Sequence, residues 1–84
     1  MLDLNKIPQN ERIALTTIYE EYLAAKKQHS PFNSPHEAYA IILEELEETW
    51  HLIKNDEKPW AGRDAMKYEI KAVGAMVLRF LLEL

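Results

Sequence analysis

An 84-residue chain without cysteine cannot form a disulfide, a thiolate metal site or a cysteine nucleophile, and it is short enough to make a single domain. Its 48% hydrophobic and 29% charged residues are typical of a folded protein, and its formal net charge of -4 argues against binding to duplex nucleic acid. No stretch approaches the roughly 18 apolar residues of a membrane span, and no basic and apolar leader is present, so the cytoplasm is the expected location.

Helical periodicity predicts a first helix over about residues 9–29, directly after Pro8. Lys26 and Lys27 in its last turn suit the negative end of the helix dipole. Its apolar residues recur at helical spacing on one stripe: Ala14, Leu15, Ile18, Tyr22 and Ala25.

The linker SPFNSP, with two prolines, separates this helix from a second one predicted over about residues 35–54. Ser34 and Glu37 form a capping-box pattern, in which the Ser34 hydroxyl accepts from the Glu37 amide and the Glu37 carboxylate reaches back. Pro35 occupies the first helical position, where its missing N–H costs nothing. The broader apolar side of this helix holds Tyr39, Ile42, Leu43, Leu46, Trp50 and Ile53.

The polar segment NDEKPWAG, with Pro59 and Gly62, predicts a turn before a third helix over about residues 63–84. Gly74 costs about 1 kcal/mol relative to alanine inside a helix, which favours a close helix contact there over simple tolerance of a small side chain. The main apolar stripe of this helix contains Met66, Val73, Met76, Val77, Phe80 and Leu84.

The predicted fold is therefore all-α, with three helices and no strands. Folding alone buries only roughly 60% of the surface of a chain of this length, so we expect the three helices to be part of a helical bundle that is completed by oligomerisation.

The second helix carries four glutamates in five positions, in the segment EELEE. At 100° per residue, Glu45 and Glu48 fall within roughly 60° of Ile41 and Leu52, with Glu44 at the edge of this group. Glu47 points elsewhere and is expected to be a solvated surface charge. The cluster is either a solvated face or a set of metal ligands.

Glu69 lies inside the apolar stripe of the third helix and so needs a partner, because burying an unpaired carboxylate costs several kcal/mol. Arg63, Lys71 or a tyrosine would satisfy it, and so would a cation. If the acids of the two helices converge, Glu44, Glu45, Glu48 and Glu69 form an oxygen-only site suited to Mg²⁺ or Mn²⁺, which would bind a polyphosphate and activate a water for attack on phosphorus.

The segments FNSPHEAYAIILEELEETW and EIKAVGAMVLRFLLEL together resemble the short, phage-type members of the MazG-like, all-α nucleoside triphosphate pyrophosphohydrolases. That family carries two adjacent glutamates, a third glutamate three residues later, and then Glu and Asp three apart. Glu44, Glu45, Glu48 and Glu69 match this pattern, whereas Ala72 stands where the family has Asp.

The resemblance implies an Mg²⁺- or Mn²⁺-dependent hydrolase that converts an NTP or dNTP to the monophosphate and pyrophosphate. It also implies Glu45 and Glu48 as catalytic residues and assembly into a homodimer or homotetramer. Because alanine cannot ligate, metal binding should be weaker than in the family. The alternative is a non-catalytic helical interaction or oligomerisation module of phage origin that has lost ligands.

Other candidate sites have weaker support in the sequence. His29, His36 and His51 lie in the linker or on different helical faces, so a zinc site is not expected. Trp50 and Trp60 are interpreted as core or interface residues more readily than as platforms for a base. No glycine-rich phosphate loop is present, and the sequence identifies no substrate-binding residue.

Overall fold

The computed structural model describes the backbone of residues 2–55 and 59–84 and the side chains of residues 2–55 and 63–84. A short 3₁₀ turn, Leu4–Lys6, precedes three α-helices: α1 (Gln9–Gln28), α2 (Pro35–Lys54) and α3 (Pro59–Glu83). The described residues contain no strand, so the all-α, three-helix prediction is confirmed. None of the described helices is both long and apolar enough to cross a membrane.

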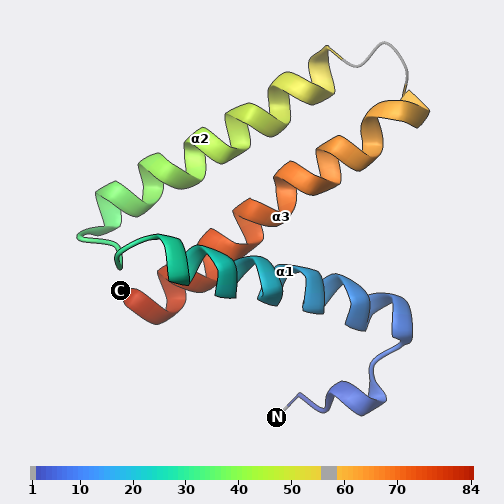
Figure 1. Ribbon diagram of the computed structural model, residues 1–84, viewed down its shortest axis with the longest axis horizontal. Coiled ribbons are helices and arrows are strands. Elements are labelled where there is room, and N and C mark those ends of the chain that lie inside the picture. Colours follow the sequence, from blue (N-terminus) through green and yellow to red (C-terminus); the bar gives the residue numbers. More distant parts are fainter. Residues whose placement is uncertain (1, 56–58) are drawn as a thin grey trace.

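The three helices form an open arrangement in which α3 packs against both α2 and α1 (Figure 1). α2 and α3 run antiparallel as a hairpin, and α1 crosses the C-terminal half of α3. This arrangement places the acidic residues of α2 opposite α3.

The predicted boundaries of the first two helices agree with the structure within one residue. The Ser34 hydroxyl accepts a hydrogen bond from the Glu37 amide at 3.1 Å, as predicted, and Pro35 opens α2. The Glu37 carboxylate reaches back one residue further than the capping box requires. It accepts from the Asn33 amide at 3.3 Å and from Asn33 Nδ2 at 2.9 Å.

The predicted start of the third helix at residue 63 is wrong, because α3 begins at Pro59. Proline is well suited to the first turn of a helix, since its φ angle is already helical and no N–H is needed there. Gly62 therefore lies within α3 and not in a turn. The part of the predicted turn at residues 56–58 lies outside the described residues.

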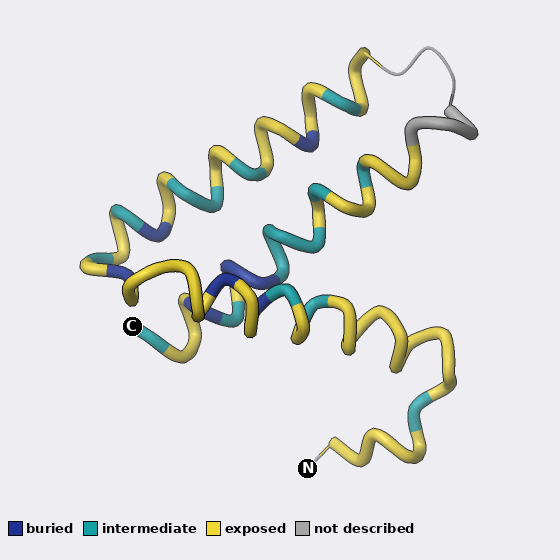
Figure 2. Tube along the Cα trace, viewed as in Figure 1, coloured by how far each residue is buried: buried dark blue, intermediate teal, exposed yellow. Residues whose placement is uncertain are grey.

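The core is small and lies where the end of α1, the start of α2 and the C-terminal half of α3 meet (Figure 2). Ile41, Ile42 and Leu78 pack against its edge. The stripe predicted on α1 is buried only in its C-terminal part, because Ala14 and Leu15 are exposed. The buried apolar residues of this core are Tyr22, Ala25, Phe32, Ala38, Ala75 and Met76.

Gly74 has the packing role that its position in a helix suggests. A Cβ atom built on it would lie 3.1 Å from both Cγ1 and Cγ2 of Ile18, which is tighter than ordinary van der Waals contact. The absence of a side chain at residue 74 therefore lets α1 approach α3 closely. The neighbouring Ala75 is fully buried at the same contact region.

Candidate metal site

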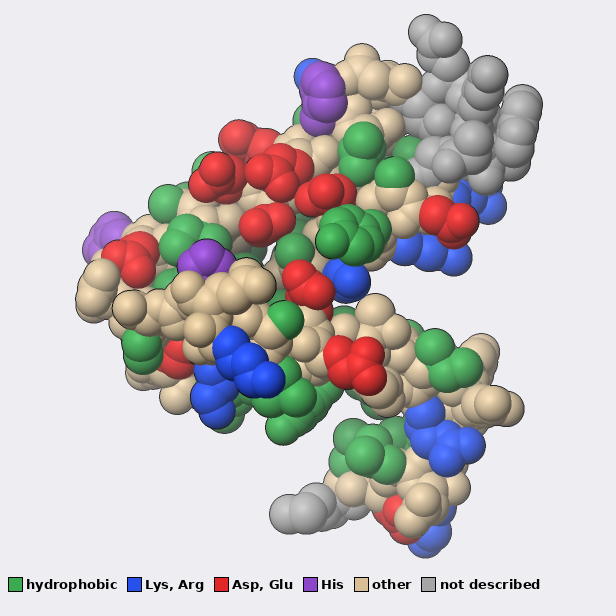
Figure 3. Space-filling view, in the orientation of Figure 1, with side chains coloured by type: hydrophobic (Ala, Val, Ile, Leu, Met, Phe, Trp, Pro, Cys, Tyr) green, Lys and Arg blue, Asp and Glu red, His purple; other side chains and the backbone are tan. Residues whose placement is uncertain are grey.

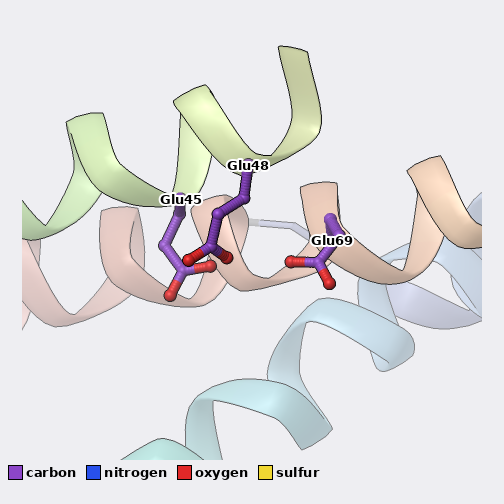
Figure 4. Close-up of side chains that lie close together, drawn as sticks. All are labelled: Glu45, Glu48 and Glu69. Carbon is purple, nitrogen blue, oxygen red and sulfur yellow. The ribbon is translucent and has the colours of Figure 1, made fainter. Parts of the chain in front are cut away.

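Three of the four predicted carboxylates come together between α2 and α3 (Figure 4). Glu45 and Glu48 project from α2, and Glu69 projects from α3 into the same space. Each offers a carboxylate oxygen, and these oxygens all lie within 4.8 Å of one another. Glu45 and Glu69 are half-buried and Glu48 is exposed. We call these three residues the acidic triad.

Glu44 does not belong to the acidic triad, because it is about 100° around α2 from Glu45 and its carboxylate is not among the oxygens that lie within 4.8 Å of one another. It lines an open depression of about 430 Å³ together with Glu48 and Glu69. Glu47, expected to be a solvated surface charge, is exposed and lines the same depression. The surface around the acidic triad is strongly acidic (Figure 3).

Electrostatic repulsion within this group is not offset by a neighbouring cation among the described side chains. Neither Lys71 nor Arg63 forms an ion pair with Glu69, and no described tyrosine donates a hydrogen bond to it. Lys71 pairs instead with Glu21 of α1, at 3.4 Å between Nζ and Oε2, and its ammonium lies 4.2 Å from the centre of the Tyr68 ring. Glu69 is thus a half-buried carboxylate that faces two other carboxylates.

The pKa of Glu45 is raised above its ordinary value, first by burial and then by the negative charges of Glu48, Glu69, Glu44 and Glu21. Both causes disfavour the ionised carboxylate. A divalent cation between the acids would offset the repulsion among the carboxylates, because each negative charge would attract the cation.

The spacing of the oxygens fits one divalent ion. Mg²⁺ binds oxygen at about 2.1 Å, so ligands on opposite sides of the ion lie about 4.2 Å apart. The carboxylate oxygens of the acidic triad lie within 4.8 Å of one another, so small side-chain rotations would bring them to such a separation. Carboxylate oxygens without sulfur or imidazole ligands favour Mg²⁺ or Mn²⁺ over softer metals.

Two further residues near the site were not identified from the sequence. Glu21 of α1 adds to the repulsion at Glu45, and His51 lines the depression. The ring nitrogen Nδ1 of His51 lies 3.1 Å from Asn55 Nδ2. Glu21 gave no signal in the sequence, because its position depends on how α1 crosses α3. His51 was considered from the sequence only as a zinc ligand, and not as a residue beside the acidic cluster.

Comparison with protein-family models, with curated proteins and with the solved structures finds no match in any of the three. The structure itself therefore supports a coarse conclusion: this is a small all-α protein with an acidic triad able to hold a metal ion.

Neutralising Glu45 should stabilise the metal-free protein at neutral pH. Because the folded-state pKa of Glu45 is raised, the folded protein binds this proton more tightly than the unfolded chain does. The proton bound to Glu45 therefore stabilises the folded state. This stabilisation is complete below the pKa of Glu45 in the unfolded chain, and it is lost as the pH rises through the raised folded-state pKa. Each like-charge pair costs about 0.5 kcal/mol, so we expect Glu45→Gln to raise Tm by about 2–4 °C in EDTA at pH 8.

Thermal unfolding followed by circular dichroism at pH 8 and at pH 4 checks this expectation. The gain should disappear at pH 4, where the wild-type carboxyl is protonated. Glu47→Gln is the matched control, since it removes the same charge from the same helix outside the acidic triad. A gain of equal size at both pH values would show that repulsion is not its cause.

Proposed function

We propose that this protein is a metal-dependent nucleotide pyrophosphohydrolase of the MazG-like type, which hydrolyses an NTP or dNTP to the monophosphate and pyrophosphate. The observation that supports this proposal is the convergence of Glu45 and Glu48 with Glu69. The three residues come from the two sequence segments that resemble that family, and they project from two different helices into one space.

A divalent ion held by the acidic triad would supply a Lewis acid for the phosphate oxygens of the substrate. The chain itself contributes the ligands and a base. Glu48 and Glu69 line the depression and would hold the ion where a triphosphate can approach. An acidic protein needs such an ion to bind a polyphosphate, because its own charges repel one.

Glu45 is the candidate for the general base, because its half-buried carboxylate lies beside those of Glu48 and Glu69, where it can accept a proton from a water between α2 and α3. In the proposed reaction a water oxygen bonds to the α-phosphorus and the bond from that phosphorus to the bridging oxygen breaks. Pyrophosphate leaves with the bonding electrons, and the water proton passes to a Glu45 carboxylate oxygen. The products are the nucleoside monophosphate and pyrophosphate.

Release of pyrophosphate and monophosphate from a panel of NTPs and dNTPs, with Mg²⁺, with Mn²⁺ and with EDTA, tests the proposal directly. Production of both products in equal amounts, dependent on the metal, is the expected result. Release of inorganic phosphate alone would point to cleavage at the γ-phosphate and would contradict the proposed bond.

Ala72 offers a gain-of-function prediction. It is half-buried one turn after Glu69 on α3, at the position where the family has a carboxylate. We expect Ala72→Asp to bind Mn²⁺ about tenfold more tightly than the wild type, because a fourth carboxylate joins the site. Isothermal titration with Mn²⁺ measures this effect. Ala72→Asn, which has a similar shape but no charge, is the control, and equal affinity for the two variants would refute the prediction.

The alternative function, a non-catalytic helical interaction module, is favoured by two observations. Ala72 removes one ligand of the family pattern, and large apolar side chains are exposed on all three helices. An interaction module needs no metal, so its Tm would not rise with Mn²⁺, whereas binding to the acidic triad would raise it. Absence of both turnover and a metal-dependent Tm shift would favour this alternative.

A further inference from the structure

An apolar groove runs along α1, between that helix, the N-terminal segment and the C-terminal half of α3. Its volume is about 730 Å³, larger than the depression beside the acidic triad and within the range of about 300–1,000 Å³ that is typical of small-molecule sites. None of the described residues lines both hollows. We call this second hollow the α1 groove.

Three parts of the chain that are far apart in sequence form the walls of the α1 groove. The N-terminal segment folds back alongside α1, and α3 closes the other side where Gly74 lets α1 approach it (Figure 1). Most of the apolar side chains that line the groove are exposed, so a ligand would remove them from water. These apolar side chains are Leu2, Leu4, Leu15, Tyr19, Val77 and Leu78.

The charged residues of the α1 groove stand at the two ends of its α1 wall. Arg12 is the first α1 residue that lines the groove and Glu20 is the last, eight residues or about 12 Å further along the helix axis. Between them, only the hydroxyls of Thr16 and Tyr19 are polar side-chain groups. Arg12 forms no ion pair with any side chain that the structure describes. The groove therefore has a cationic end, an apolar middle and an anionic end.

This order of charges suits a ligand that is negative at one end and apolar along the rest. A carboxylate can accept two parallel hydrogen bonds from the Arg12 guanidinium. A second anionic group at the far end of the ligand would be repelled by Glu20, and a cationic head group would be repelled by Arg12. Each carbon–carbon bond of about 1.5 Å advances an extended chain by about 1.3 Å, so about 12 Å accommodates nine or ten carbons.

We propose that the α1 groove binds the free anion of a straight-chain carboxylic acid of about ten carbons. The carboxylate lies on Arg12, and the alkyl chain runs toward Val77 and Leu78. The binding site uses none of the residues of the acidic triad. This inference does not depend on the proposed pyrophosphohydrolase activity.

Isothermal titration of the full chain with decanoate, below its micelle concentration, tests the proposal. We expect one decanoate per chain and a gain in affinity of about two- to fourfold for each methylene added between hexanoate and decanoate. Sebacate, the ten-carbon dicarboxylate, and decyltrimethylammonium should bind at least about tenfold more weakly than decanoate, because Glu20 repels the first and Arg12 the second. Equal affinity for decanoate and decyltrimethylammonium would show undirected adsorption to an apolar surface and would overturn the proposal.

Two substitutions place the ligand in the α1 groove. Arg12→Met should weaken decanoate binding about fivefold, and Val77→Asp, which puts a carboxylate beside the alkyl chain, should weaken it at least about tenfold. Lys27→Met removes an exposed cation from the same helix outside the groove, and Leu82→Asp changes a side chain of α3 that is 67% exposed outside it. Both of these control variants should bind decanoate as the wild type does.

The Arg12 variant keeps the test decisive if Val77→Asp fails to fold, because Arg12 is exposed and its replacement removes no buried contact. Wild-type affinity for decanoate in Arg12→Met would overturn the proposal. So would the absence of decanoate binding to the wild type at millimolar concentration, or a loss in Lys27→Met equal to that in Arg12→Met.

Discussion

Glu69→Gln should abolish metal-dependent pyrophosphate release without unfolding the protein. Glu69 is the member of the acidic triad that comes from α3. A glutamine side chain has nearly the same shape as glutamate but no charge. Changes to residues that merely support a metal ligand cost about 10–100-fold in affinity or activity, so loss of a ligand should cost at least about 100-fold. The far-ultraviolet circular dichroism spectrum should be unchanged, because the residue is only half-buried.

The same variant should also lose the stabilisation that a bound metal provides. At a metal concentration of about one hundred times Kd, binding stabilises the folded state by about 2.7 kcal/mol, or a rise of more than 10 °C in Tm for a domain of this size. We expect the wild type to show such a rise with Mn²⁺ and Glu69→Gln to show little of it.

Glu20→Gln, which removes an exposed carboxylate from α1, is the control for both measurements. It should retain the activity and the metal-dependent rise in Tm of the wild type. Full activity in Glu69→Gln would contradict the proposed function. Loss of activity with an undiminished metal-dependent rise would instead mean that the ion binds at other residues.

The fold was largely predictable because local signals mark where the helices begin and end. Ser34, Pro35 and Glu37 start α2 through contacts within five residues of sequence, and the structure shows the predicted cap. Pro59 was misinterpreted because proline and glycine close together are typical of a turn. Proline is equally typical of the first turn of a helix, and the sequence alone does not separate the two.

The acidic triad was partly predictable, because one helical face of α2 carries Glu45 and Glu48 whatever lies opposite. That Glu69 faces these two residues depends on the register of α3 against α2, which a sequence pattern does not specify. The apolar periodicity of α2 predicted its broader apolar side. It did not reveal that most of these residues are exposed and that the buried residues of this helix are Ala38 and Thr49.

Arg79→Met should cause a large loss of stability. Arg79 is only 3% exposed and ties the end of α3 to the loop between α1 and α2. Its Nη2 donates to the Ser30 carbonyl at 2.8 Å, its Nε donates to Glu83 at 2.9 Å, and its guanidinium lies 4.1 Å from the centre of the Phe32 ring. Glu83 in turn accepts from the Phe32 amide at 2.8 Å.

Methionine keeps the length and the apolar contacts of Arg79 but leaves the Ser30 carbonyl and Glu83 without this donor. Removing one partner of a buried charge pair costs about 3–5 kcal/mol, and partial solvent access to Glu83 reduces this to about 2–3 kcal/mol. We therefore expect Tm to fall by roughly 10–20 °C. Arg12→Met, which changes an exposed arginine of α1, should shift Tm by much less.

The pH dependence of this loss identifies its cause. The hydrogen bond from Arg79 is the main reason that the pKa of Glu83 is lowered below its ordinary value. The stabilisation is therefore present above the unfolded pKa and is lost as the pH falls through the lowered folded value. In urea unfolding, the difference between wild type and Arg79→Met should be largest at pH 6–7 and should shrink as the pH falls below about 4. A difference that stays constant down to pH 2 would mean that Arg79 acts through its hydrogen bond to the Ser30 carbonyl and its contact with the Phe32 ring, and not through the Glu83 carboxylate.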